Sequence, residues 1–136
     1  HTALRDFSGD PVLVDGVDVM PEIRVELEKV KVFVEQIHKG QLLGVTGKVI
    51  TDVVNLGVGG SDLGSVMATE SLTEYRQGKV GLHFVSSIDG THLTDVLHAV
   101  EAETTLFIIS SKSFRSSTKG SPGRFKEVFK TISKSV

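Results

Sequence analysis

Apolar residues recur at helical spacing in one segment near the amino-terminal end of the chain. Ile23, Leu27 and Val30 are three or four residues apart, and the pattern continues to residue 37. We therefore predict a helix over residues 21–39, with a proline at its first position and Gly40 at its carboxyl-terminal cap. The single apolar face of this helix requires a sheet or another helix to cover it.

Residues 6–21 lead into the start of this helix and contain two glycines and two prolines, which predicts an irregular connector. At 136 residues the chain is long enough for one ordinary domain with a core. We expect residues 1–50 to form a connector and a helix that packs on the domain, and residues 51–136 to form the domain itself.

From Thr51 onward, short apolar runs alternate with segments of helical spacing. The predicted elements are strands at 52–58, 80–87 and 104–110, helices at 61–72 and 89–100, and a last helix at 124–133. The third strand is apolar on both faces, as buried parallel strands are. This alternation predicts an α/β fold, in which flanking helices cover a parallel sheet.

Composition excludes several classes of protein. The formal net charge of −2 provides no general basic surface for nucleic acid or membranes. The chain has no cysteine, which excludes disulfides and thiolate chemistry and fits a reducing compartment. No apolar run approaches the length of a transmembrane helix.

The stretch NLGVGGSDLG, residues 55–64, places four glycines directly after a predicted strand. Such glycines let the backbone turn sharply or approach another group closely. In open parallel sheets, ligands bind beyond the carboxyl ends of the strands, where the first amides of a helix can hold an anion. Close packing of helix and strand is the alternative. The hydroxyl of Ser61 slightly favours a ligand, although Ser61 or Asp62 also suits the N-cap of the predicted helix.

Neither of the specific nucleotide-binding motifs fits this loop. A dinucleotide fingerprint requires glycine where Asp62 stands, and the acidic side chain would lie against the pyrophosphate. A P-loop requires lysine where Ser65 follows Gly64. A smaller phosphate is therefore the ligand to consider.

A second polar loop, SSKSFRSST at residues 110–118, directly follows the third strand. It carries six hydroxyl groups together with Lys112 and Arg115. Hydroxyl and amide groups can surround phosphate oxygens, and hydrogen bonds to charged groups are worth roughly 1.5–3 kcal/mol each. A flexible serine-rich loop is the alternative. Two such loops beyond neighbouring strands of one sheet favour a small phosphate site.

The segments TGKVITDVVNLGVGGSDLGS, HFVSSIDGTH and LFIISSKSF resemble the phosphoglucose isomerase (glucose-6-phosphate isomerase) family, and the resemblance extends from His1 to about Phe114. It implies part of a sugar-isomerase (SIS) domain, a flavodoxin-like αβα sandwich. It further implies that the whole protein interconverts glucose 6-phosphate and fructose 6-phosphate in glycolysis and gluconeogenesis. That enzyme would be a cytoplasmic homodimer that needs no metal or nucleotide cofactor.

The resemblance also implies a set of phosphate- and sugar-binding residues, namely Gly60, Ser61, Ser111, Lys112, Ser113 and Ser116. The family usually has threonine in place of Ser113 and Ser116, so the hydroxyl groups are kept. Arg115, Thr118 and Ser65 stand where the family usually has threonine, glutamate and proline. Residues 119–136 no longer follow the family pattern.

The family's catalytic stretches are absent from this chain. No segment resembles the base-glutamate motif MESNGK, and no segment in the right setting resembles the arginine motif GGRFS. Glu101 and Glu103 precede the third strand at its amino end, away from the predicted site, and the five histidines have no spacing typical of metal ligands. We therefore expect no catalytic residue and no metal site in this chain, and no activity from this chain alone. These absences, and a chain that begins with His1, indicate a fragment of the enzyme.

Two other interpretations stay open. The first is a non-catalytic SIS-type module that binds a sugar phosphate without transforming it. It predicts a stable monomer in which the amide signals near Ser61 and in the second loop shift on titration with hexose phosphate. The second is a secreted signalling role, which the resemblance allows for some family members and which only a receptor-binding assay could support.

Overall fold

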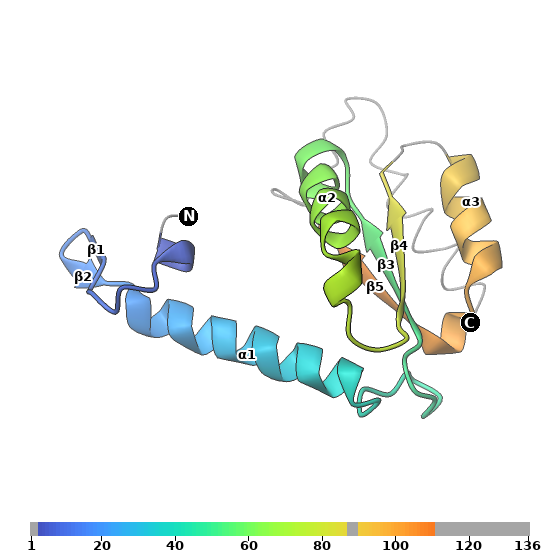
Figure 1. Ribbon diagram of the computed structural model, residues 1–136, viewed down its shortest axis with the longest axis horizontal. Coiled ribbons are helices and arrows are strands. Elements are labelled where there is room, and N and C mark those ends of the chain that lie inside the picture. Colours follow the sequence, from blue (N-terminus) through green and yellow to red (C-terminus); the bar gives the residue numbers. More distant parts are fainter. Residues whose placement is uncertain (1–2, 87–89, 111–136) are drawn as a thin grey trace. The chain divides into compact units, whose positions relative to one another are not determined.

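Figure 1 shows the computed structural model of the chain, which describes residues 3–86 and 90–110. The chain divides into two compact units, residues 1–39 and residues 40–136. The helix predicted at 124–133 lies outside the described residues.

In the first unit, a 3₁₀ turn at Ala3–Arg5 precedes a short antiparallel hairpin of β1 (Leu13–Val14) and β2 (Val17–Asp18). The two turn residues, Asp15 and Gly16, have φ angles of 51° and 81°. Both angles lie in the left-handed region, which a two-residue Asp-Gly hairpin turn requires. The prediction of an irregular connector is therefore wrong here. Strands of two residues are too short to show alternation, but the Asp-Gly pair between two valines was a usable signal.

Helix α1 spans Met20–His38, which confirms the predicted helix to within one residue at each end. Asp18 holds its start, because Asp18 Oδ1 accepts a hydrogen bond from the first N–H of the helix at 3.0 Å. Gly40 follows its end with a φ of 63°, a conformation that glycine adopts at low cost. Leu27 and Val30 of its predicted apolar face are 41% and 59% exposed.

Within the described ranges, neither α1 nor any other helix combines the length and apolar character needed to cross a membrane.

The second unit is built on three parallel strands, β3 (Asp52–Leu56), β4 (Gly81–Val85) and β5 (Thr105–Ile109). Their order is β4-β3-β5, so β3 is the central strand. Helix α2 (Leu63–Ser71) follows β3, and α3 (Gly90–Ala99) follows β4. The predicted α/β fold with a parallel sheet and flanking helices is confirmed. Short 3₁₀ helices occur at Gly59–Ser61, Thr73–Tyr75 and Ala102–Thr104.

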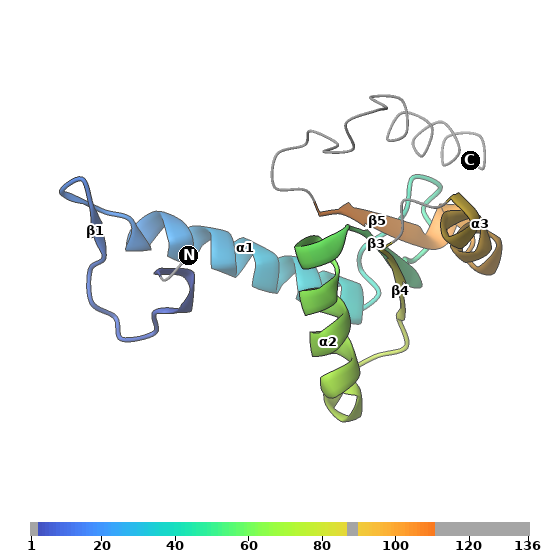
Figure 2. The same ribbon diagram turned by 90° about the horizontal axis from the view of Figure 1, so that it is seen from above.

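The strand order brings the carboxyl ends of β3 and β5 side by side. After β4 the chain crosses β3 to reach β5, and α2 and α3 lie on opposite sides of the strands (Figure 1 and Figure 2). The parallel register pairs Leu56 with Ile109 at these ends. Parallel α/β sheets bind ligands beyond the carboxyl ends of the strands, at the point where the strand order reverses, which here lies between β3 and β5.

The core of this unit lies between the sheet and α3. Val54, Leu56 and Val85 are buried and form a cluster with Leu93 of α3. β5 is an edge strand of the described sheet, and Ile108 is 44% exposed. The predicted burial of this strand on both faces is therefore only partial among the described residues, where Leu106 is half-buried and Ile108 is exposed.

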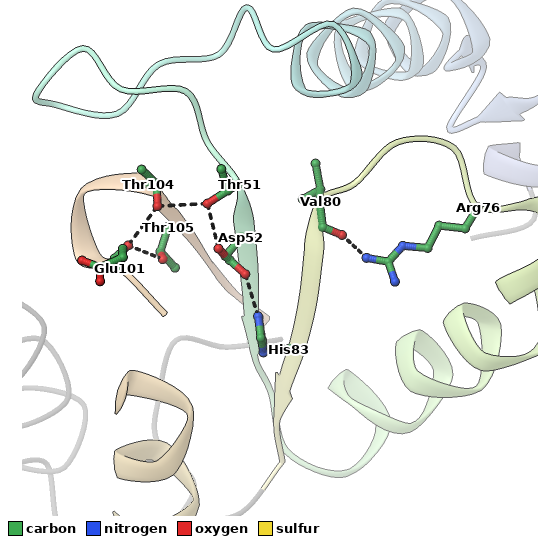
Figure 3. Close-up of polar contacts among 8 residues, drawn as sticks. All are labelled: Thr51, Asp52, Arg76, Val80, His83, Glu101, Thr104 and Thr105. Atoms are coloured by element: carbon green, nitrogen blue, oxygen red, sulfur yellow. Dashed lines mark hydrogen bonds and ion pairs between the residues drawn. The ribbon is translucent and has the colours of Figure 1, made fainter. Parts of the chain in front are cut away.

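The amino edge of the sheet carries a network of polar contacts, which Figure 3 shows. Asp52 accepts hydrogen bonds from His83 Nε2 and from the Thr51 hydroxyl, each at 2.8 Å. The Thr51 hydroxyl is also 3.0 Å from the hydroxyl of Thr104, which directly precedes β5. Gly81 leaves room for this arrangement, because an added Cβ would overlap Asp52 Oδ1. The network therefore links all three strands near their first residues.

The environment of Asp52 lowers its pKa. Burial by itself would raise the pKa of this carboxyl, but the hydrogen bonds from His83 and Thr51 and the charge of His83 outweigh burial. The pKa of Asp52 therefore lies below its ordinary value of 3.8.

We expect Asp52 to stabilise the fold at neutral pH and to lose this contribution in acid. The pKa of Asp52 is lower in the folded state than in the unfolded state. The stabilisation is therefore complete above the unfolded-state pKa, and it disappears as the pH falls through the folded-state pKa. Asp52→Asn should lower the free energy of unfolding by about 1–2 kcal/mol at neutral pH and should flatten its decline below about pH 4. Urea unfolding over this pH range measures both effects.

Gly81→Ala is the matched variant, since its methyl group displaces the same carboxylate. It should flatten the acid decline as Asp52→Asn does. If the free energy of unfolding declined equally with falling pH in the native protein and in Asp52→Asn, Asp52 would not be the source of the acid decline.

Candidate functional site

Two loops leave the carboxyl edge of the sheet from neighbouring strands. Gly57 follows β3, and Ser110 follows β5. Main-chain hydrogen bonds continue past both strand ends: Ser110 N–H donates to the Leu56 carbonyl at 2.9 Å, and Gly57 N–H donates to the Val85 carbonyl at 3.2 Å. The first predicted binding loop therefore begins at the end of the central strand, and the second begins beside it at the end of β5.

The first loop turns back on itself directly after β3. A Cβ added at Gly57 would lie 2.5 Å from the main-chain oxygen of Ser61, so only glycine lets the turn close in this way. Close packing, the alternative to ligand binding, thus explains Gly57. It does not explain Gly60, which is exposed and where an added Cβ would meet no described atom within 4 Å.

The exposed part of this turn presents hydrogen-bond donors. Ser61 N–H donates to the Val58 carbonyl at 3.3 Å within the turn. The N–H groups of Gly59 and Gly60 have no acceptor among the described residues, and neither does the hydroxyl of the half-buried Ser61. Free donors before the first turn of a helix are suited to binding an anion.

Asp62 is a buried charged residue of this turn. It occupies the N-cap position of α2, one of the two residues predicted there, but its side chain makes no capping hydrogen bond. Asp62 is 3% exposed, and within the described part of the chain its Oδ1 has no hydrogen-bond partner. A buried polar atom is costly without a partner. No local sequence pattern separates a buried carboxylate from an exposed capping one, so this feature was not predicted.

Asn55 of β3 contacts both loops. It is 8% exposed, its Nδ2 donates to the main-chain oxygen of Ser61 at 3.5 Å, and its Oδ1 accepts from the Ser110 hydroxyl at 2.8 Å. Asn55 was not among the site residues predicted from the sequence. The available signal was a polar residue inside an apolar strand, two positions before the first glycine of the loop.

The structure describes the predicted site residues of the first loop but not those of the second. Gly60 and Ser61 lie on the turn between β3 and α2. Of the second loop only Ser110 is described, and it lies beside Asn55. The remaining predicted binding residues lie outside the described residues; they are Ser111, Lys112, Ser113 and Ser116.

The acidic residues considered in the sequence lie at the other edge of the sheet. Glu101 and Glu103 precede β5 at its amino end, as predicted, and Glu103 forms an ion pair with Lys48. His83 contacts Asp52 at the same edge. Within residues 3–86 and 90–110, no three side chains of the metal-binding types come together as a possible site.

Comparison with known proteins agrees with the sequence motifs. The sequence profile of the phosphoglucose isomerase family matches residues 1–121. The fold is similar to that of a glucose-6-phosphate isomerase from Chlamydia trachomatis D/UW-3/Cx, with a TM-score of 0.73 and 23% sequence identity. The similarity covers 98% of this chain and 24% of that protein, so the chain spans about a quarter of its length. The resemblance predicted from the motifs is confirmed, and the chain belongs to the phosphoglucose isomerase family.

Proposed function

We propose that the whole protein is a glucose-6-phosphate isomerase and that this chain supplies the phosphate-binding part of its site. The observation that carries the proposal is the parallel pairing of β3 with β5, which starts a glycine-rich loop with Ser61 and a hydroxyl-rich loop from neighbouring strand ends. The free N–H groups of Gly59 and Gly60 add donors at this edge. Membership of the family favours a hexose 6-phosphate as the anion.

In the proposed site, the two loops share the recognition of the sugar phosphate. Gly60 and Ser61 contact it from the turn after β3, and the second loop grips the phosphate group. Hydroxyl and amide donors bind phosphate oxygens through charge-assisted hydrogen bonds, and Lys112 supplies a positive charge. The first turn of α2 adds the partial positive charge of a helix start. The residues assigned to the second loop are Ser111, Lys112, Ser113 and Ser116.

The proposed reaction converts the aldose glucose 6-phosphate into the ketose fructose 6-phosphate and back. It requires ring opening and the transfer of a proton between C2 and C1 through an enediol, for which a carboxylate serves as the base. Glu101 and Glu103 lie at the amino edge, and Asp62 is buried. We therefore assign no catalytic residue to this chain and place the acid–base groups elsewhere in the whole enzyme.

The whole enzyme is proposed to be a cytoplasmic homodimer that acts in glycolysis and gluconeogenesis without a metal or nucleotide cofactor. A net charge of −2 without a general basic surface favours a small-molecule substrate over nucleic acid or a membrane. The substrate supplies its own phosphate, which gives the site a charged group to hold while the sugar reacts.

Replacing Lys112 by alanine should weaken the binding of glucose 6-phosphate, fructose 6-phosphate and inorganic phosphate by about 10- to 100-fold, because a hydrogen bond to a charged group is worth roughly 1.5–3 kcal/mol. The affinity for glucose, which carries no phosphate, should not change. Calorimetric titration of the full-length protein measures all four ligands. Lys79→Ala is the control, because it removes the same charge from an exposed position before β4. Equal weakening for glucose and for the phosphates would show that Lys112 holds the fold rather than the phosphate.

A polypeptide of residues 1–136 alone should bind fructose 6-phosphate but should not turn it over. Losing an acid or base group typically costs about 10²–10⁴ in rate for each role. A coupled assay for glucose 6-phosphate measures turnover, and calorimetry on the same sample measures binding. Turnover near that of an intact isomerase would place the acid–base groups in this chain. Binding without turnover by the full-length protein as well would favour the non-catalytic SIS-type module.

A further inference from the structure

Asn55 is a buried polar residue in the middle of an apolar strand. Its neighbours Val54 and Leu56 point into the core, so the Asn55 side chain points to the other face of the sheet. A buried amide is costly unless both its donor and its acceptor are bonded. Both groups of Asn55 are bonded, and both partners, Ser61 and Ser110, belong to the loops rather than to the sheet.

The two partners determine which way the amide faces. The main-chain oxygen of Ser61 can only accept a hydrogen bond, so Nδ2 of Asn55 faces it, at 3.5 Å. Oδ1 then faces Ser110, whose hydroxyl donates at 2.8 Å. The reversed amide would place two oxygens against each other at Ser61. Neither an apolar residue nor an ionised aspartate could make both bonds.

We propose that Asn55 is a positioning residue, which sets the spacing of the two loops and thereby the affinity of the site for phosphate. The inference rests on the function proposed above. One hydrogen bond holds the turn at Gly59–Ser61 over the end of β3, and the other holds Ser110, the first residue of the second loop. A ligand held by both loops requires them at one separation. Fixing that separation before the ligand arrives reduces the ordering cost of binding.

A purely structural role predicts a different result. Main-chain hydrogen bonds already join the strand ends, including the bond from Ser110 N–H to the Leu56 carbonyl at 2.9 Å. The side chain of Asn55 adds a link between the loops. Its removal should therefore weaken ligand binding, whereas removal of core volume at Val54 should reduce stability alone.

The test compares three single variants of the full-length protein. Asn55→Ala removes both hydrogen bonds, Ser110→Ala removes one of them, and Val54→Ala weakens the adjacent core without removing either. Calorimetry gives Kd for inorganic phosphate and fructose 6-phosphate, and urea unfolding gives stability. Asn55→Ala and Ser110→Ala should each raise both Kd values about tenfold, which corresponds to about 1.4 kcal/mol. Val54→Ala should lower the unfolding midpoint and leave Kd unchanged under conditions in which it is folded.

Two further variants separate positioning from simple loss of contacts. The Asn55→Ala/Ser110→Ala double variant should bind about as weakly as Asn55→Ala alone, because the two residues share one hydrogen bond. Ser110→Thr keeps the hydroxyl and should bind as the native protein does. The pair of Ser110 variants keeps the test decisive if Asn55→Ala fails to fold.

If the native protein binds phosphate and both alanine variants bind it equally well, the inference is overturned while the proposed function stands. An equal rise in Kd for Val54→Ala would also overturn it, because affinity would then follow stability. If the native protein binds neither phosphate nor fructose 6-phosphate, the proposed function fails, and the inference fails with it.

Discussion

The pairing of β3 with a strand on each side is the interaction on which the rest of the structure depends. Both pairings are parallel and in register, so Leu56 lies opposite Val85 on one side and Ile109 on the other. All three strands consequently begin at one edge of the sheet and end at the other. Asn55 and Ser110, which are 55 positions apart in the sequence, thereby come into contact at the carboxyl edge.

The two edges differ in how completely their polar groups are bonded. At the amino edge, the Asp52 carboxylate has partners on both oxygens, and this network joins the strands. At the carboxyl edge, the N–H groups of Gly59 and Gly60 and the Oδ1 of Asp62 have no partner among the described residues. Water can reach the exposed donors, but the buried carboxylate oxygen is costly to leave unpaired. This contrast favours stability as the role of the amino edge and binding as the role of the carboxyl edge.

Local patterns in the sequence predicted the elements well because each has its own periodicity and its own boundary residues. The hairpin at Asp15 and Gly16 was missed because its strands are too short for alternation, although its turn residues were informative. At the site, the glycine-rich loop was predictable. The sequence did not show that Gly57 is required for close packing whereas Gly60 is exposed. A polar residue inside an apolar strand was a usable signal for Asn55, but its contact with Ser110, 55 positions away, is contained in no local pattern. The burial of Asp62 had no local signal either.

The proposed site requires that two loops at one edge of the sheet hold one phosphate. Backbone amide chemical shifts, followed by NMR while inorganic phosphate is added, test it most directly. The amide signals of Gly59, Gly60 and Ser61 should shift together with those of residues 111–116 along one saturation curve, while the signal of Gly78, before β4, should not shift. Shifts confined to one loop, or two different saturation curves for the two loops, would contradict it.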